Sequence, residues 1–295
     1  MKNILIDGKV TSQKIKKNIA AQVAKMIDND EKAPHLAAVL VGADPASEFY
    51  VKSKEKACKS VGIISSVYKH SERTSEAELL EIIDFLNNDP EVDGFIVQLP
   101  LPKHIDVDRV INRINPAKDV DGFHPMNIGK MVIGAPTYLP ATPAGIMMMI
   151  EEYKIETAGK NVVVLGRSNI VGTPISIMLS RKASPGNATV TLCHSRTQNL
   201  AEICKNADVI IAAIGQPEFL KADMVKKGVV IIDVGIHRVN DDTKEKGYRI
   251  TGDVDFKEVS KKASLITPVP GGVGLMTIAA LLENTLKAAK KEVYR

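Results

Sequence analysis

The sequence predicts an α/β protein of two domains, each built on a parallel β-sheet. Apolar runs rich in β-branched residues alternate with helical patterns almost throughout the chain, which is typical of parallel strands buried on both faces. A Pro/Gly-rich interval at 134–145 interrupts this series and marks the best domain boundary. The 295 residues leave room for two domains of ordinary size.

Three helices and three strands are predicted before that interval. The helices follow a 3.6-residue apolar period, and the strands are short, continuous apolar runs. The predicted helices cover 9–28, 46–61 and 75–88, and the predicted strands cover 36–42, 63–69 and 93–99.

The second half repeats the alternation. A helix that begins near Thr142 bridges the two halves, and its three consecutive methionines are core filler rather than a cofactor site. An amphipathic helix at 274–291 ends the chain. The predicted strands of this half cover 161–166, 189–193, 208–215, 229–235 and 264–269.

Composition and charge narrow the function. Aromatic residues make up 4% of the chain and the net charge is only +4, so we expect no nucleic-acid partner. Three widely spaced cysteines and six unclustered histidines predict neither disulfides nor a bound metal. Asp7 interrupts the first apolar run, and no stretch has the length of a membrane span. We therefore expect a cytoplasmic protein without a signal peptide or a membrane segment.

One lysine of the helix 46–61 lies on the apolar face of that helix. At about 100° per residue, Lys52, Lys56 and Lys59 point away from the apolar stripe. Lys54 lies in the middle of the stripe, one turn after Tyr50. Because desolvating an ammonium is costly, two interpretations stay open. Lys54 either extends along the stripe to water or lies in a cleft, where it has a function.

The second half opens with a strand, a glycine turn and a helix. Gly166 and Gly172 allow a tight turn, and the helix after Gly172 offers free N–H groups to an anion. The glycines are spaced differently from the G-x-G-x-x-G dinucleotide fingerprint. The pair is therefore as consistent with a purely structural turn as with a nucleotide site.

The end of the next strand discriminates between cofactors. NAD enzymes have an acidic residue there, whereas this chain has Ser195 and Arg196, and Arg167 follows the first glycine. Two arginines and a serine can hold a 2′-phosphate through charge-assisted hydrogen bonds, which predicts NADP. Gly215, at the end of the predicted strand 208–215, is expected beside the nicotinamide half.

Eight short segments together resemble the bifunctional methylenetetrahydrofolate dehydrogenase/cyclohydrolase family over essentially the whole chain. Each segment is modest support alone, but their joint occurrence in this order is specific. The segments are Y-x3-K (Tyr50, Lys54), VQLPLP (97–102), KDVDG (118–122), GRSNIVGTP (166–174), CHSRT (193–197), GQP (215–217), GDVD (252–255) and TPVPGGVG (267–274). The chain departs from the family at Leu275, where a proline would pre-set the first helical turn.

The resemblance implies a cytoplasmic homodimeric oxidoreductase and hydrolase of one-carbon metabolism that serves purine biosynthesis. It would oxidise 5,10-methylenetetrahydrofolate with NADP⁺ and then hydrolyse the methenyl product to 10-formyltetrahydrofolate. The substrates are tetrahydrofolate derivatives, with polyglutamylated forms among the candidates. The implied domains are a folate-binding catalytic domain at 1–145, which the C-terminal helix 274–295 rejoins, and a Rossmann-like, doubly wound NADP-binding domain at 146–273.

The same resemblance implies the site residues. Lys54 would be the catalytic lysine and Gln98 would position it, while Tyr50 packs on the folate. Asp121 would hold the pterin, although the residues alone do not decide between Asp121 and Asp119. Further folate contacts would come from Pro270, Gly271, Gly272 and Val273. Cofactor contacts would come from Gly166, Arg167, Ser168, Ile170, Gly172, Ser195, Arg196, Gly215 and Ile236.

Two alternative functions are less well supported. One is a dehydrogenase with weak or lost cyclohydrolase activity, which the presence of Tyr50, Lys54 and Gln98 argues against. The other is a nucleotide-sensing regulator on an α/β scaffold, for which no basic stripe or DNA-reading helix is visible.

A lysine on an apolar face suits hydrolysis, because burial favours a neutral amine that can take a proton from water.

Overall fold

The structure is a computed structural model that describes residues 4–245 and 247–294, and the chain forms two compact units. We name each unit by its main sheet. The six-stranded unit comprises residues 1–12 and 142–277, and the three-stranded unit comprises residues 13–141 and 278–295. Residues 1–3, 246 and 295 of the predicted domain ranges lie outside the described residues.

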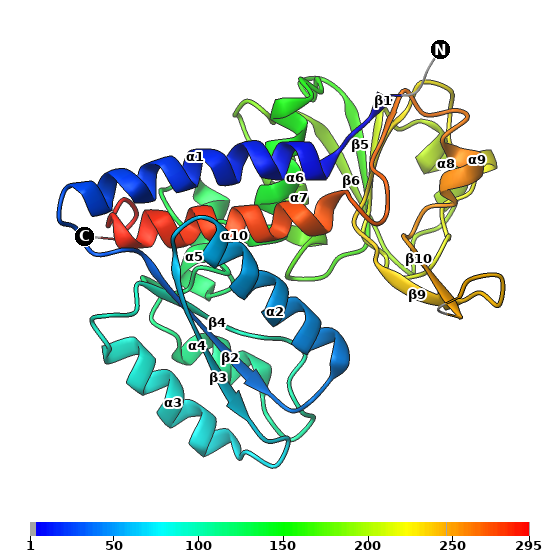
Figure 1. Cartoon of the computed structure of the whole chain (residues 1–295). Coiled ribbons are helices and arrows are strands. Elements are labelled where there is room, and N and C mark those ends of the chain that lie inside the picture. The colour runs from blue at the N-terminus through cyan, green and yellow to red at the C-terminus, as the bar shows by residue number, and fades with distance from the viewer. Residues whose placement is uncertain (1–3, 246, 295) are drawn as a thin grey trace. The chain divides into compact units, whose positions relative to one another are not determined.

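The three-stranded unit is built on a parallel sheet with β2 (His35–Val41) at its centre. β3 (Ile64–His70) pairs with one edge of β2, and β4 (Gly94–Val97) pairs with the other. β4 is buried along its whole length and β2 along all but its first residue, because helices cover both faces of the sheet. Figure 1 shows α2 (Pro45–Ser60) and α3 (Glu76–Asn88) on opposite sides of it.

The sequence itself fixes where α2 and α3 begin. The Asp44 carboxylate accepts a hydrogen bond from Ser47 N at 2.8 Å, and Pro45 occupies the first turn of α2. Ser75 and Glu78 form a capping box at the start of α3. The predicted helices 46–61 and 75–88 are therefore confirmed to within one residue.

Smaller helices follow β4. α3 contacts α4 (Val107–Arg113), and both pack on one face of the sheet. α5 (Pro125–Ile133) ends at Gly134, whose φ of +76° lies in the left-handed region that favours glycine. α4 and α5 are absent from the predicted elements, because seven and nine residues give too few turns for a clear period.

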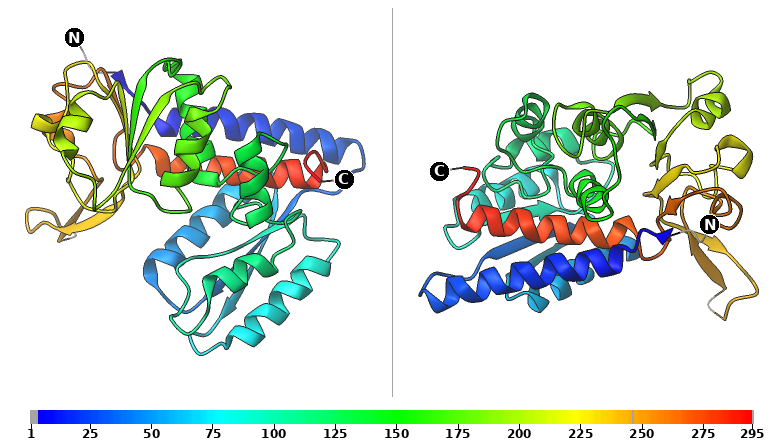
Figure 2. Two further views of the ribbon diagram at one scale, coloured as in Figure 1. Left: turned by 180° about the vertical axis from the view of Figure 1, so that it is seen from behind. Right: turned by 90° about the horizontal axis from the view of Figure 1, so that it is seen from above.

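The C-terminal helix returns to the first half of the chain, as predicted. Residues 13–28 of α1 (Gly8–Asp28) lie beside residues 278–289 of α10 (Val273–Ala289), as the views of Figures 1 and 2 agree. Lys290 Nζ donates to Gln22 Oε1 at 2.6 Å. The buried Asn284 donates to the carbonyl oxygens of Val120 and Leu139 at 2.9 and 3.0 Å. The C-terminal helix is thus part of the three-stranded unit's core.

The main sheet of the six-stranded unit is wholly parallel, in the order β1-β11-β8-β7-β5-β6. β5 lies between β6 and β7, so the direction of chain progression reverses at β5. In doubly wound sheets, ligands bind beyond the carboxyl ends of the strands at such a reversal. The strands are β1 (Ile4–Leu5), β5 (Asn161–Leu165), β6 (Thr189–Cys193), β7 (Val209–Ala212), β8 (Val230–Asp233) and β11 (Leu265–Ile266).

Short helices and an antiparallel ribbon connect these strands. The helices are α6 (Ala141–Glu152), α7 (Gly172–Ser180), α8 (Leu200–Lys205), η1 (Ala222–Met224) and α9 (Phe256–Val259). The ribbon pairs β9 (His237–Asn240) with β10 (Tyr248–Thr251). It is absent from the predicted elements, because its four-residue strands contain arginine and have no buried face of useful length.

Three predicted strands of this sheet are shorter than expected, and the one predicted at 229–235 is limited to Val230–Asp233. The strand predicted at 208–215 ends at Ala212, because Ile214 N and Gly215 N donate to the Asp253 carboxylate instead of a neighbouring strand. The strand predicted at 264–269 is limited to Leu265–Ile266. Apolar residues continue after the last residue of each of these strands, so the sequence pattern alone overstates the length of the strands.

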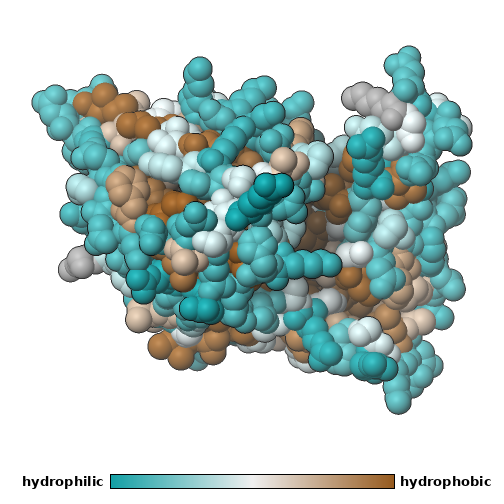
Figure 3. Space-filling model, turned by 90° about the horizontal axis from the view of Figure 1, so that it is seen from below, coloured by the Kyte–Doolittle hydropathy of each residue, from teal (hydrophilic) through white to brown (hydrophobic). Residues whose placement is uncertain are grey.

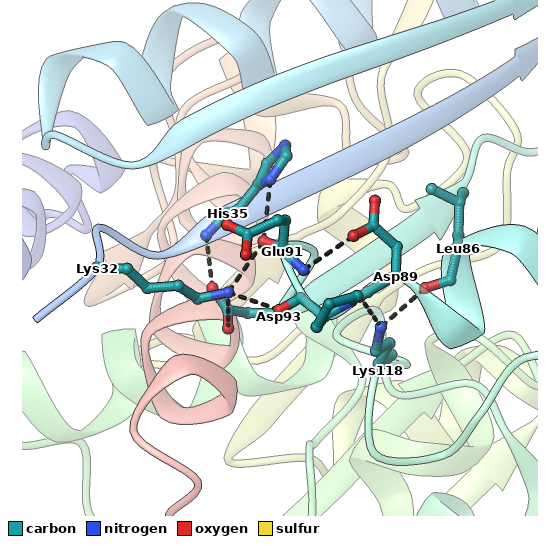
Figure 4. Close-up of polar contacts among 8 residues, drawn as sticks. Lys32, His35, Leu86, Asp89, Glu91, Asp93 and Lys118 are labelled. Carbon is teal, nitrogen blue, oxygen red and sulfur yellow. Dashed lines mark hydrogen bonds and ion pairs between the residues drawn. The ribbon is translucent and has the colours of Figure 1, made fainter.

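A polar cluster fixes the amino edge of the three-stranded sheet (Figure 4). Lys118 Nζ donates to the carbonyl oxygens of Leu86 and Asp89, at 2.8 and 2.6 Å, at the end of α3. Burial lowers the pKa of Lys118. Lys32 Nζ similarly donates to Pro90 O and Glu91 O, and it pairs with Asp93. These contacts hold the start of the segment 118–122, which carries two of the aspartates considered below.

The surface carries no large continuous apolar area on the face shown in Figure 3, where hydrophilic side chains separate smaller apolar patches. None of the helices in the described ranges combines the length and the apolar character needed to span a membrane.

We expect Lys118→Met to destabilise the protein by about 1–3 kcal/mol, because two carbonyl oxygens at the end of α3 lose their donor. Urea unfolding followed by circular dichroism measures this. Lys32→Met is the matched control, since the Lys32 side chain is 43% exposed and water can replace it. Equal losses for the two variants would contradict a special role for Lys118.

Candidate active site

Helix α2 places Lys54 differently from its neighbouring lysines. Lys52, Lys56 and Lys59 are exposed, whereas Lys54 is half-buried, on the same side as the buried Ala57. The helical periodicity predicts this arrangement, and the structure confirms it. The buried residues Val51, Ala57 and Cys58 anchor this side of α2 in the unit.

The Lys54 side chain ends at a glutamine. Lys54 Nζ donates to Gln98 Oε1 at 3.1 Å, and Gln98 Nε2 donates to Leu99 O at 2.6 Å. The second bond fixes which end of the amide faces the lysine. Gln98 N donates to Val39 O at 2.9 Å, so Gln98 directly continues the pairing of β4 with β2. The lysine therefore meets a rigidly held acceptor at the carboxyl edge of the sheet.

The two aspartates of the segment 118–122 have different environments. Asp119 is 2% exposed, and its carboxylate accepts hydrogen bonds from Gly122 N, His124 N and Asn127 Nδ2 at 3.1, 2.7 and 2.8 Å. Within the described residues, the half-buried Asp121 carboxylate accepts none. Asp119 is thus committed to the fold, and Asp121 is free to bind a ligand.

Electrostatics at Asp121 reflect burial and one nearby cation. Burial raises the pKa of Asp121, the charge of Lys54 acts against this rise, and the charge of Asp119 adds to it. The sequence brings Lys54, Gln98 and Asp121 from three separate segments, and the structure brings them to one region of the three-stranded unit. A lysine, an amide and an uncommitted carboxylate can together orient a polar heterocycle and move a proton.

Tyr50 adds an aromatic surface one turn before Lys54. It is half-buried, and burial raises the pKa of its phenol. Its ring makes an edge contact with Phe49, with the ring centres 6.1 Å apart. Phe49 is 67% exposed, so this aromatic pair faces solvent at one side.

The predicted cofactor residues lie in the six-stranded unit, and most of them follow β5 or β6, at the reversal point of its sheet. Gly166 follows β5 with φ +107°, and a Cβ there would lie 2.0 Å from Ala213 O. A Cβ on Gly172 would lie 1.9 Å from Gly166 O. Both glycines are therefore required by the close packing of the turn itself, whatever it binds.

Charged and polar side chains surround this turn. Arg167, Ser168 and Ile170 are exposed, as are Ser195 and Arg196 after β6. Gly166 N donates to Cys193 O at 2.9 Å, which joins the two loops at one edge. Neither arginine forms an ion pair with any residue in the part of the chain that the structure describes. This edge thus presents two uncommitted guanidinium groups, which suit a phosphate.

The other residues predicted to contact the cofactor or the folate differ in how exposed they are to solvent. Gly215 is exposed after β7 and Ile236 is 44% exposed after β8. Pro270 is exposed, and Gly271 has φ +111°. Gly272 is buried, and Val273 is 2% exposed at the start of α10.

Sequence reasoning missed a buried polar cluster near Gly215 and Ile236. Its members are Asp233, His237, Asp253 and Thr267. The segment GDVD at 252–255 was a visible signal, but its side-chain partners are distant in sequence. The described residues contain no group of three or more His, Cys, Asp or Glu that could hold a metal ion.

Comparison with known proteins gives consistent matches. The family model described as the tetrahydrofolate dehydrogenase/cyclohydrolase catalytic domain matches residues 6–121, and the NAD(P)-binding domain model of the same name matches residues 140–293. The chain is 60% identical to the bifunctional protein FolD of Flavobacterium psychrophilum over 288 residues, which is 98% of each chain.

Solved structures agree with these matches. The bifunctional methylenetetrahydrofolate dehydrogenase/cyclohydrolase of Campylobacter jejuni is 49% identical, with a TM-score of 0.91 over 98% of this chain and 99% of that one. The Trypanosoma brucei enzyme, complexed with NADP cofactor and inhibitor, is 34% identical, with a TM-score of 0.93 over 100% of both chains.

The contrast between the two aspartates gives a stability prediction. Asp119→Asn should cost about 1–3 kcal/mol, because buried N–H donors lose a charged acceptor. Asp121→Asn should leave stability unchanged or raise it at neutral pH: burial raises the pKa of Asp121, so its ionised form disfavours folding above its usual titration range. Thermal unfolding at pH 7 measures both. A larger loss for Asp121→Asn would overturn the assignment.

Proposed function

The chain belongs to the tetrahydrofolate dehydrogenase/cyclohydrolase family, and from this premise we propose how its residues divide the work of two reactions. The protein is a bifunctional methylenetetrahydrofolate dehydrogenase and methenyltetrahydrofolate cyclohydrolase. We assign folate binding to residues 1–145 with 274–295, and cofactor binding to residues 146–273. The hydrogen bond between Lys54 and Gln98 is the single observation that carries the catalytic assignment.

The dehydrogenase step needs mainly orientation. NADP⁺, when bound, supplies the hydride acceptor, so the protein must hold the folate carbon against it. We assign this holding to Asp121 and Tyr50. The Asp121 carboxylate has two oxygens that no described residue uses, and it can accept two N–H groups from the amino-pyrimidine edge of the pterin. The half-buried ring of Tyr50 offers a face for packing.

The hydrolysis step needs a proton acceptor that later becomes a donor. Water adds to the cationic methenyl carbon and loses a proton, and a ring nitrogen must gain a proton before it leaves. We assign both transfers to the amine of Lys54. Gln98 accepts one N–H of this amine at 3.1 Å, and a neutral amide orients the group without taking its proton.

We propose NADP rather than NAD as the main cofactor. The family model specifies an NAD(P)-binding domain, and the finer choice rests on the edge beyond β5 and β6. Arg167, Ser195 and Arg196 are exposed there without an acidic neighbour in sequence, and they suit the 2′-phosphate.

Three further proposals concern the setting of the enzyme. Its substrates are tetrahydrofolate derivatives, with polyglutamylated forms among them. It works as a homodimer. It acts in the cytoplasm, in line with its bacterial relatives and the absence of a membrane-spanning helix from the described ranges.

Lys54→Met tests the proton shuttle. We expect hydrolysis of methenyltetrahydrofolate to fall by about 10²-fold or more, with NADP⁺ affinity within about twofold of the wild type, because only the proton transfer is lost. Absorbance decay of the methenyl compound measures this. Lys52→Met, an exposed lysine on the same helix, should retain full activity. Unchanged hydrolysis in Lys54→Met would exclude the lysine, and methenyl accumulation by the wild type would favour a dehydrogenase without hydrolysis.

Arg167→Ala tests the cofactor choice. Losing a charge-assisted bond to the 2′-phosphate should raise the Michaelis constant for NADP⁺ about 10–100-fold, with little effect for NAD⁺, which lacks that phosphate. Steady-state kinetics with both cofactors measure this. Lys160→Ala, which removes the same charge before β5, is the control. Equal effects of Arg167→Ala on both cofactors would mean that Arg167 does not contact the extra phosphate.

A further inference from the structure

Two buried aspartates lie at the carboxyl edge of the six-stranded sheet, beside the loops that follow β7 and β8, whereas Arg167 and Arg196 follow β5 and β6. Asp233 ends β8 and is 3% exposed, and Asp253 is fully buried. The Asp233 carboxylate accepts hydrogen bonds from Gly235 N, Asp253 N and Val254 N at 3.0, 2.9 and 3.0 Å. Asp233 therefore fixes the backbone from which the Asp253 side chain extends.

Asp253 in turn holds two other segments. Its Oδ2 accepts Ile214 N at 2.7 Å and Gly215 N at 3.0 Å, beyond the end of β7. Its Oδ1 lies 2.7 Å from His237 Nε2, at the start of β9. One carboxylate thus joins the loops that follow β7 and β8, which are neighbours in the sheet.

Glycines leave space for this arrangement. A Cβ on Gly252 would lie 1.9 Å from Asp233 Oδ2, and a Cβ on Gly235 would lie 2.4 Å from Asp253 Oδ1. Burying two neighbouring carboxylates is costly, and burial raises the pKa of Asp233 to about 7, with the charge of Asp253 adding to the rise. The hydrogen bonds that offset this cost all come from groups at the ends of strands or in loops at the carboxyl edge of the sheet.

The loops that Asp253 joins carry two of the proposed cofactor contacts. Gly215 N is bonded directly to Asp253, and Ile236 precedes His237, which is also bonded to it. The other proposed contacts, Arg167, Ser195 and Arg196, follow β5 and β6 and make no hydrogen bond to this carboxylate. The cluster therefore holds only the loops after β7 and β8, and not those after β5 and β6.

We propose that Asp253, supported by Asp233 and His237, is a positioning residue that holds the loops after β7 and β8 in the shape that receives the nicotinamide half of the dinucleotide. This inference rests on the proposed function. It assigns Arg167 and Arg196 to the adenosine half of the dinucleotide and the loops that Asp253 holds to the nicotinamide half. A ligand that contains only the adenosine half therefore tests the arginines without testing these loops.

Titration calorimetry with NADPH and with adenosine 2′,5′-bisphosphate tests this in Asp253→Asn. The amide cannot accept all three hydrogen bonds, so the loop after β7 loses its anchor. We expect the dissociation constant for NADPH to rise roughly tenfold or more, and that for adenosine 2′,5′-bisphosphate to change less than about twofold. Asp208→Asn is the control, because Asp208 bonds Asn161 N and Lys226 at the opposite edge of the same sheet.

A second pair of variants keeps the test decisive if Asp253→Asn does not fold. His237 is partly exposed, so its replacement is milder. His237→Leu removes the bond to Asp253, whereas His237→Gln can restore a donor. We expect His237→Leu to weaken NADPH binding and His237→Gln to recover at least half of that loss on a logarithmic scale, with adenosine 2′,5′-bisphosphate unaffected by either.

The outcomes of these measurements distinguish a failure of the positioning role from a failure of the proposed cofactor site. Equal weakening of both ligands, or of neither, would overturn the positioning role and leave the cofactor assignment intact. If the wild type binds adenosine 2′,5′-bisphosphate and NADPH with equal affinity, the nicotinamide half makes no contact and the inference fails. If the wild type binds neither, the proposed cofactor site itself is wrong.

Discussion

The hydrogen bond between Lys54 Nζ and Gln98 Oε1 is the contact on which the proposed catalytic site depends. A lysine on the apolar side of a helix is unfavourable unless its amine has a partner. Gln98 is that partner, and its own amide is held by Leu99 O and by the pairing of β4 with β2. A flexible, four-carbon side chain thereby gains a fixed end point. Proton transfer requires such a fixed position, because the transfer distance is short.

The aspartates show how the same side chain takes opposite roles. Asp119 accepts three hydrogen bonds from its own surroundings and holds the loop that follows it. Asp121, two residues later, has no such bond among the described residues and stays available. Asp233 and Asp253 are also buried, and each accepts three hydrogen bonds. The number of donors that the fold supplies, rather than the residue type, separates a structural carboxylate from a binding one.

Both units place their proposed functional residues at the carboxyl edge of a parallel sheet, and for the same reason. Every strand of such a sheet ends on one side, so loops from distant parts of the chain converge there. In the three-stranded unit this edge receives Gln98 after β4 and the helix that carries Lys54 after β2. In the six-stranded unit it receives the glycine turn after β5 and the Ser195–Arg196 loop after β6.

The sequence alone determined the two-domain α/β architecture, the long elements and the orientation of Lys54, because apolar periodicity records which side of an element is buried. The resemblance of eight short motifs then indicated the family. Tertiary structure decided what periodicity does not contain. It separated Asp121 from Asp119, ended β7 at Ala212 and joined Asp233, Asp253 and His237 into one cluster. Each of these depends on hydrogen bonds between groups far apart in the chain or on donors supplied by a loop's final shape, and a local pattern of residues does not specify such partners.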